Sequence, residues 1–206
     1  MSYFSNFRLT GYDLDRTNSQ NFKIVTDIFV RTKLIESLKN ELFVFYKYDV
    51  TDGDTPESLA YKYYGSTSRH WIILFANNIV DPFYDWPLTY ENFNNFLIDK
   101  YGSIENSKTG IHHYEKIITK TDSVTTTVTV NRYELDYNTY ANLASTTTET
   151  INLKDGNTVK IVTTKNALTY YDYENELNES KRSIKIIDKS YASQIESELL
   201  ALVTNS

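Results

Sequence analysis

The stretch that decides the fold reads Gly53-Asp54-Thr55-Pro56-Glu57-Ser58-Leu59-Ala60-Tyr61-Lys62-Tyr63-Tyr64-Gly65. Thr55 is a strong candidate N-cap, and Pro56 stands at the first helical position, where proline is tolerated. Gly65 is placed to end the helix in the left-handed conformation that favours glycine. The preceding residues 43–50 are aromatic and β-branched, which is typical of a strand. We therefore predict a strand, a tight turn and a short helix.

Residues 66–102 predict two further helices joined by an aromatic loop. The second helix is expected to end at Asn77-Asn78 and the third to begin after Thr89. Two of the chain's three prolines predict a rigid loop over residues 81–88, because proline removes a backbone donor from a helix or a central strand. The buried positions of these two helices are expected at helical spacing, namely Trp71, Leu74, Phe75, Phe93, Phe96 and Leu97.

The chain as a whole predicts an α+β fold in four segments. Residues 1–43 form an extended N-terminal arm and a short helix, and residues 44–104 form a compact module with the aromatic loop and the helix after it. Residues 105–166 form a threonine-rich antiparallel β region, and residues 167–206 form a helix, a strand and a final helix.

Within these segments, several local patterns carry the prediction. The arm is expected to have a strand or turn at Ile28-Phe29-Val30 and a helix over residues 32–42. Alternation of valine with polar residues predicts a strand through Val124, Val128 and Val130. Asp155-Gly156 predicts a hairpin turn. The final helix is expected to bury one face, made by Tyr191, Ile195, Leu199, Leu202 and Val203.

Composition narrows the classes of function. The net charge of −6 argues against a nucleic-acid binder, which needs a basic face. The chain has no cysteine, hence no disulfide framework and no thiolate nucleophile. The start of the chain lacks the pattern of a signal peptide, and its longest apolar run, Trp71 to Ala76, is too short to span a bilayer. We therefore expect a soluble chain made in the cytosol, with no nucleic-acid or membrane partner.

No pattern of catalytic or metal-binding residues stands out. Asp49, Asp52 and Asp54 resemble a calcium loop only faintly, because the bidentate glutamate is missing. His112 and His113 are adjacent, so on a regular strand they would point to opposite faces and could not hold one ion together. We predict no catalytic residue, no metal and no cofactor, and hence no enzyme.

Residues 46–79 resemble a LysM module, a small βααβ fold. The resemblance rests on Gly53-Asp54-Thr55 after a strand, on Leu59-Ala60 and Tyr63-Tyr64-Gly65 in the first helix, and on Asn77-Asn78 after the second. It implies binding of peptidoglycan or another N-acetylglucosamine polymer through the loop of Gly53, Asp54 and Thr55. The chain departs from LysM at residues 81–87, where the second strand of the module is expected.

That departure resembles the LysM-bearing baseplate wedge protein of contractile-tailed bacteriophages. The matching residues are Tyr64-Gly65, Trp71-Ile72-Ile73-Leu74, Asn77-Asn78, Asp81-Pro82-Phe83-Tyr84-Asp85-Trp86, Lys100-Tyr101-Gly102 and residues 176–187. The resemblance implies a late structural protein of the virion, assembled in the host cytoplasm. Its implied role is to clamp wedge subunits and link neighbouring wedges, with the sheath-initiating and hub-proximal proteins as further partners.

Two functions from different classes therefore compete, a virion scaffold and a glycan-binding module with weak peptidoglycan contact. A wall hydrolase anchored by the module is a third, which zymography would test. The expected contact residues of the scaffold are Phe83, Tyr84, Trp86, Arg182, Ile184 and Ile186. The alternative for the aromatic residues is that they fill the core of the module, and for the two isoleucines that they are buried in a strand.

Overall fold

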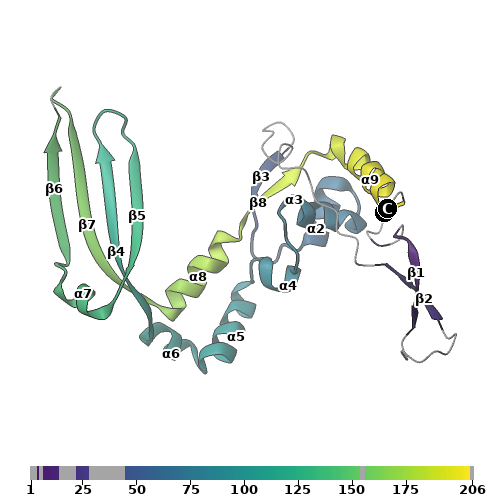
Figure 1. Ribbon diagram of the computed structural model, residues 1–206, viewed down its shortest axis with the longest axis horizontal. Coiled ribbons are helices and arrows are strands. Elements are labelled where there is room, and N and C mark those ends of the chain that lie inside the picture. Colours follow the sequence, from purple (N-terminus) through teal and green to yellow (C-terminus); the bar gives the residue numbers. More distant parts are fainter. Residues whose placement is uncertain (1–3, 5–6, 14–21, 28–44, 154–155, 205–206) are drawn as a thin grey trace. The chain divides into compact units, whose positions relative to one another are not determined.

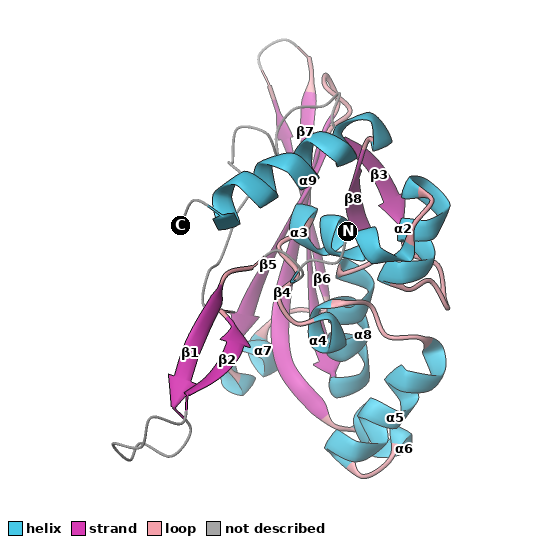
Figure 2. Cartoon of the chain, turned by 90° about the vertical axis from the view of Figure 1, so that its right-hand side faces the viewer, coloured by secondary structure: helices cyan, strands magenta, loops and turns pink. Residues whose placement is uncertain are grey.

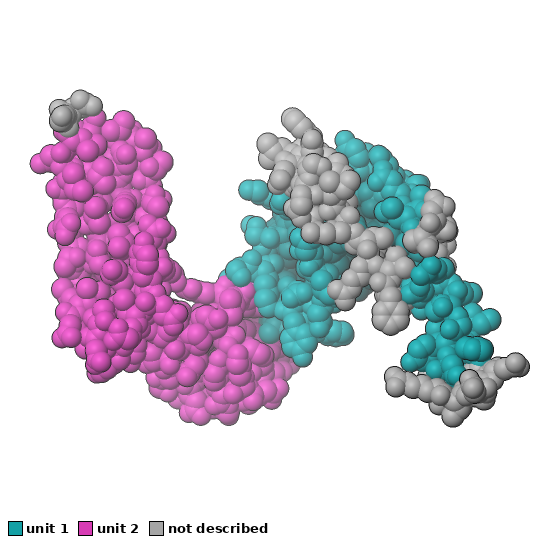
Figure 3. Space-filling view, viewed as in Figure 1, with its two compact units in different colours: residues 1–89, 179–206 teal, residues 90–178 magenta. Residues whose placement is uncertain are grey.

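A computed structural model describes residue 4 and residues 7–13, 22–27, 45–153 and 156–204 (Figure 1). The expected strand or turn at Ile28-Phe29-Val30 and the helix over residues 32–42 lie outside these residues. The chain has a mixed α/β fold with small antiparallel sheets. It divides into two compact units: unit 1 is residues 1–89 with 179–206, and unit 2 is residues 90–178 (Figure 3).

A two-stranded sheet in unit 1 joins distant parts of the sequence. Strand β3 (Phe45–Asp49) pairs antiparallel with β8 (Ser183–Ile187), in a register that sets Phe45 against Ile187 and Asp49 against Ser183. Between them in the sequence come α2 (Pro56–Tyr64), a 3₁₀ turn (Thr67–Arg69), α3 (His70–Ala76) and α4 (Pro82–Asp85), and then all of unit 2. The long final helix α9 (Lys189–Thr204) follows β8 directly. The partner strand of β3 is therefore supplied by the C-terminal part of the chain.

The caps of α2 are those expected from the sequence. Thr55 is the N-cap: its side chain accepts a hydrogen bond from the backbone N–H of Ser58, whose own hydroxyl accepts one from the backbone N–H of Thr55. Pro56 occupies the first turn, and Gly65 ends the helix at φ +71°. Reciprocal capping of this kind satisfies backbone donors that no helical carbonyl can reach.

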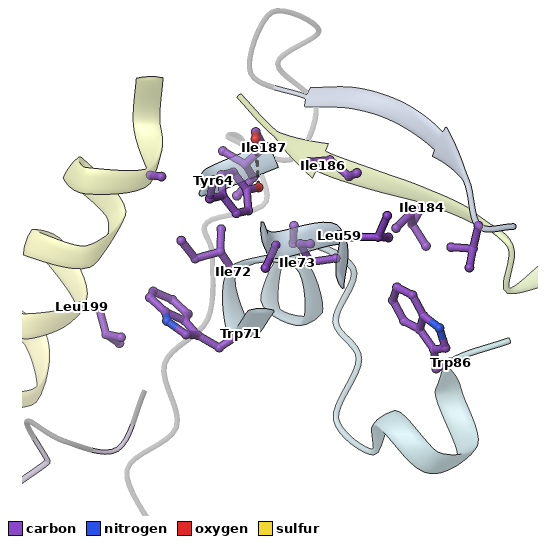
Figure 4. Packing of buried hydrophobic residues seen from close by; sticks show 14 of the residues in the cluster. Leu59, Tyr64, Trp71, Ile72, Ile73, Trp86, Ile184, Ile186, Ile187 and Leu199 are labelled. Atoms are coloured by element: carbon purple, nitrogen blue, oxygen red, sulfur yellow. Dashed lines mark hydrogen bonds between the residues drawn. The ribbon is translucent and has the colours of Figure 1, made fainter. Parts of the chain in front are cut away.

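The hydrophobic core of unit 1 lies between α2, α3, β8 and α9 (Figure 4). Leu59, Ile72, Ile73 and Ile186 are fully buried there. The predicted stripe of α3 is only partly right: Trp71 is buried, whereas Leu74 and Phe75 are half-buried. Helix α3 contacts both α2 and β8, so it buries consecutive residues instead of one narrow stripe.

The buried face of α9 is rotated from the predicted one. Ala192, Leu199 and Val203 are buried, and Ile195 packs against the core, but Leu202 is 59% exposed. The face that meets the core therefore runs through positions 192, 195, 199 and 203, which repeat at helical spacing as closely as the predicted set.

The N-terminal arm contains a hairpin where an extended segment was expected. Strands β1 (Leu9–Asp13) and β2 (Phe22–Thr26) pair antiparallel along their whole length. At the base of the hairpin, Phe7 is buried in the core of unit 1, and the Arg8 Nε donates to Asp27 Oδ2 at 2.8 Å.

Unit 2 carries a four-stranded antiparallel sheet in the order β5-β4-β7-β6 (Figure 1). Figure 2 shows the strands in magenta from another side. Its strands are β4 (Ile111–Asp122), β5 (Val128–Leu135), β6 (Thr146–Asn152) and β7 (Thr158–Thr169). The helices of this region are α5 (Tyr90–Tyr101), α6 (Ile104–Thr109), α7 (Tyr137–Asn142) and α8 (Tyr170–Ser180), which runs on into unit 1.

Antiparallel strands form where the threonine-rich β region was predicted, and β6 and β7 make the one hairpin that was expected. Gly156 lies in the turn between β6 and β7 at φ +78°, where its N–H donates to the Leu153 carbonyl. Val124, expected in a strand, lies instead in the turn after β4, because Asp122 accepts the Val124 N–H and closes the turn there. Helices α6 and α7 are too short for their periodicity to be recognised in the sequence.

Candidate partner-binding surface

The loop of Gly53, Asp54 and Thr55 is held by contacts within the chain. Gly53 has φ +89°, and a Cβ placed there would meet nothing within 4 Å. The position therefore favours glycine because of its left-handed backbone and not because space is short. Asp54 Oδ2 accepts hydrogen bonds from the Tyr48 hydroxyl at 2.8 Å and from the Thr51 N–H at 2.9 Å. Partial burial raises the pKa of Asp54, but the hydrogen bonds from Thr51 and Tyr48 outweigh it and hold the pKa below its ordinary value.

The expected proline loop contains a single helical turn, α4, because Pro82 stands at the first helical position, where no backbone donor is lost. Asp81 is the N-cap and accepts from the Phe83 N–H at 3.0 Å. Asp85 Oδ2 accepts from the N–H groups of Val80 at 3.2 Å and Asp81 at 3.1 Å. The turn is thus fixed at both ends by carboxylates, which also leave it acidic.

This corner presents two aromatic side chains to solvent. Phe83 is 87% exposed and Tyr84 is 75% exposed. Their backbone is anchored on the far side, where Lys181 donates to the Tyr84 carbonyl. We call Phe83 and Tyr84 on α4 the aromatic corner. Rigid, exposed aromatic residues are the kind of anchor that protein interfaces favour.

Trp86 does not belong to the aromatic corner, although it is close in sequence. Only 7% of it is exposed, and its Nε1 donates to the Asp54 carbonyl at 3.0 Å. Figure 4 shows its ring turned toward the core residues of unit 1. This burial corresponds to the alternative considered for the loop aromatics, and it ties α4 to the loop after β3.

The three other expected contact residues lie on or next to β8. Ile184 and Ile186 are buried in the core of unit 1. Arg182 donates through Nε to Glu179 Oε1 at 2.8 Å and through Nη1 to the Val50 carbonyl at 3.2 Å. These side chains therefore close the β3–β8 join, and in this fold the two isoleucines have no free surface for a partner.

A second exposed apolar surface lies on the β1–β2 hairpin. Opposite residues of paired strands share a face, so the register places Leu9, Phe22 and Ile24 together. All three are more than half exposed, with Ile24 at 75%. An isolated two-stranded sheet is marginally stable in water, so this face needs a cover. The alternation of apolar residues in residues 22–26 is the signal that could have found it.

The buried charges of unit 2 serve its structure. Glu174 accepts hydrogen bonds from Lys100 Nζ at 2.6 Å and the Tyr101 hydroxyl at 2.7 Å, joining α8 to α5. The hydrogen bond to Glu174 raises the pKa of Lys100, although burial opposes it. Glu115 is buried and accepts from the Asn166 amide at 2.9 Å. Each of these carboxylates is matched by donors, so the pattern is that of a stabilised fold.

The two adjacent histidines differ from the prediction. Their Nδ1 atoms lie 2.7 Å apart, and the His112 ring stacks on Tyr173. The reason is an irregularity in the β4–β7 register between Ile111 and His113, which interrupts the alternation of side chains. Over the described ranges, no cluster of three or more His, Cys, Asp or Glu side chains could hold a metal ion. Within the same ranges, no helix has the length and apolar character needed to cross a membrane.

Comparison with known proteins gives one family. A comparison with curated proteins finds no match to the chain. The family described as base plate wedge protein 53 matches residues 3–202. That match confirms the baseplate wedge resemblance found in the sequence, while the LysM character of the module stays a prediction. Because the match spans nearly the whole chain, the chain belongs to the base plate wedge protein 53 family, whose role is structural and whose place is the phage tail base plate.

Proposed function

We propose that this chain clamps wedge subunits of the phage base plate and links neighbouring wedges during assembly, with the aromatic corner as a principal contact. The observation that carries the proposal is the exposure of Phe83 and Tyr84 on a turn that Asp81, Asp85 and Lys181 hold in place. A pre-organised aromatic pair loses little conformational freedom on binding. Its burial by a partner therefore yields more affinity than that of flexible side chains.

The chemistry of the corner also describes the surface that it fits. Phe83 and Tyr84 require an apolar pocket, and the carboxylates of Asp81 and Asp85 at its base favour a pocket with a basic rim. The hairpin face of Leu9, Phe22 and Ile24 adds a second apolar contact. A protein with two separate contact surfaces can bridge two subunits, which is what linking wedges requires.

Reconstitution tests this proposal. Wedges from phage that lack this chain would be mixed with purified chain, and completed base plates would be scored by sedimentation and electron microscopy. The double variant Phe83→Ser, Tyr84→Ser should lower the yield at least tenfold, because loss of an interface anchor costs about 2 kcal/mol or more.

The matched control is Tyr61→Ser, which removes an aromatic side chain that is 66% exposed and belongs to α2 instead of α4. This variant should assemble normally. Normal assembly by the Phe83, Tyr84 double variant would refute the contact at the aromatic corner.

A LysM-type module that binds peptidoglycan is the second candidate. It is supported by the order β3, α2, α3 and by the pairing of β3 with β8, which together make a βααβ arrangement. The second strand of this arrangement comes from the part of the sequence that follows unit 2. Glycan binding is disfavoured because the side chains of Asp54 and Thr55 already accept hydrogen bonds within the chain. Asp54 accepts from Thr51 and Tyr48, and Thr55 accepts from Ser58.

Retention on insoluble peptidoglycan decides between the two. Under the scaffold proposal, the full chain should show no saturable retention. Saturable retention that is lost on changing residues 53–55 would support the glycan candidate and would add a second function to the scaffold.

A further inference from the structure

The two faces of the unit 2 sheet differ in composition. Opposite residues of neighbouring strands share a face, so the register assigns each side chain to one of them. On one face, the three outer rows across β5, β4, β7 and β6 are Thr, Val or Ile at every position except two. We call it the β-branched face, and its members are Ile117, Thr119, Thr121, Val128, Val130, Thr146, Thr148, Thr150, Val162 and Thr164, with Arg132 and Lys160 at opposite ends.

The other face is charged over the same length of sheet. It carries Lys116, Lys120, Lys165 and Glu149, which stand among apolar residues such as Ile118, Ile151 and Ile161. At its base, α7 packs against it, with the Tyr114 and Tyr140 rings 4.5 Å apart. Of two such faces, the one with more charges is expected to face water and the one with fewer charges to be covered.

The β-branched face is nevertheless exposed in the single chain. Val128 and Val130 are 60% and 55% exposed, and every residue of β6 is exposed. At the base of this face, Glu176 of α8 accepts from Arg132 Nη1 at 2.9 Å, but this contact leaves the outer rows open. A broad β surface with few charges, Arg132 and Lys160, is therefore left uncovered in the single chain.

We propose that a second copy of this chain covers the β-branched face, so that the two sheets form a face-to-face sandwich. Strands lie about 4.8 Å apart and rise about 3.4 Å per residue, so the outer rows span roughly 20 Å in each direction. With the relief of the side chains, two copies bury on the order of 1,000 Å², the lower limit for a specific interface. The proposal needs no contact at the aromatic corner and is independent of the wedge function.

Charge sets the direction of the two sheets. Lys160 lies at the outer end of the β-branched face, and the exposed Glu134 lies in the row at its inner end, where Arg132 is bonded to Glu176. An antiparallel arrangement, tip to base, brings each Lys160 toward Glu134 of the other copy. A tip-to-tip arrangement would bring the two lysines to the same end.

Sedimentation equilibrium of the full chain tests the proposal with two matched variants. Thr148→Lys places a charge on the β-branched face, and Thr147→Lys places the same charge on the opposite face of the same exposed strand. The wild-type chain should dimerise with a dissociation constant of about 1–100 µM, as expected for an interface of this size. Thr148→Lys should raise that constant at least tenfold, whereas Thr147→Lys should change it less than twofold.

Cross-linking gives a readout that does not depend on affinity. The chain has no cysteine, so Val162→Cys on the β-branched face and Thr163→Cys on the opposite face each provide one thiol. Packed sheets lie about 10 Å apart, so a short bismaleimide should join two copies through Cys at 162 and not through Cys at 163. A wild-type chain that stays monomeric at about 100 µM, a concentration at which a standard interface would associate, would overturn the proposal. Equal effects of the two members of either pair would overturn it as well.

Discussion

Substitution of Trp86 distinguishes two roles that the sequence leaves open, a contact with a partner and a place in the core of unit 1. As a contact residue it would tolerate truncation in the isolated chain and fail only in assembly. As a core residue it would destabilise unit 1 on truncation. Its 7% exposure and the hydrogen bond from its Nε1 to the Asp54 carbonyl at 3.0 Å favour the core.

The magnitudes follow from what each substitution removes. Trp86→Ala deletes a buried ring and leaves a cavity, which costs about 3–5 kcal/mol. Trp86→Phe keeps most of the apolar surface and removes the donor to Asp54, which costs about 1–2 kcal/mol. Because a domain is stable by only about 5–15 kcal/mol, the alanine variant should lose a large share of the free energy of unfolding. Phe83→Ser, at an 87% exposed position, should change it by less than about 0.5 kcal/mol.

Urea unfolding of each purified variant, followed by far-ultraviolet circular dichroism, measures these differences without relying on the fluorescence of the substituted ring. The order of loss should be Trp86→Ala, then Trp86→Phe, then Phe83→Ser. The reasoning is refuted if Trp86→Ala unfolds at nearly the wild-type urea concentration and yet fails in wedge reconstitution, because Trp86 would then be a contact residue.

Three further predictions test other parts of the fold. Asn77→Ala should destabilise unit 1 by about 1–2 kcal/mol in urea unfolding, because the Asn77 amide bonds both the N–H and the carbonyl of Lys185 at 2.8 Å; an unchanged midpoint would remove Asn77 from the join to β8. The lowered pKa of Asp54 means that its ionised form stabilises the fold above its unfolded value, and that this contribution is lost as pH falls through the folded pKa. Asp54→Asn should therefore cost stability at pH 7 and much less near pH 3, and a cost that does not change with pH would contradict the assignment. Gly110→Ala should destabilise unit 2 in thermal unfolding, since its Cβ would lie 2.6 Å from the Tyr170 ring, and a wild-type melting temperature would show that the ring moves freely.

Local signals in the sequence were reliable where a few adjacent residues determine the structure. The caps at Thr55 and Gly65 and the turn at Gly156 depend on backbone geometry that the residue types themselves favour. Helix α4 was missed for the same kind of reason, since Pro82 is unfavourable inside a helix but favourable at its first position. A loop and a capped turn are therefore hard to tell apart from proline alone.

Long-range structure could not be predicted from these patterns. Each strand of the β3–β8 pair has five residues. The sequence of such a short strand does not indicate which other strand it pairs with. The partner-binding prediction divided along the same line: Phe83 and Tyr84 are exposed, whereas Ile184 and Ile186 are buried. Whether an aromatic or aliphatic residue faces solvent depends on the whole chain around it.

The place of β8 in the sequence also sets an order of synthesis. When synthesis reaches residue 178, all of unit 2 has been made, but the strand that pairs with β3 and the helix that follows it have not. Until then Leu59, Ile72 and Ile73 lack the side chains that bury them, and exposed apolar surface of this kind invites aggregation or capture by chaperones. All residues of unit 2 are therefore made before those of unit 1 are complete, and unit 1 can fold only after β8 and α9 have been made. A premature stop before residue 183 would leave unit 2 complete and unit 1 without β8 and α9.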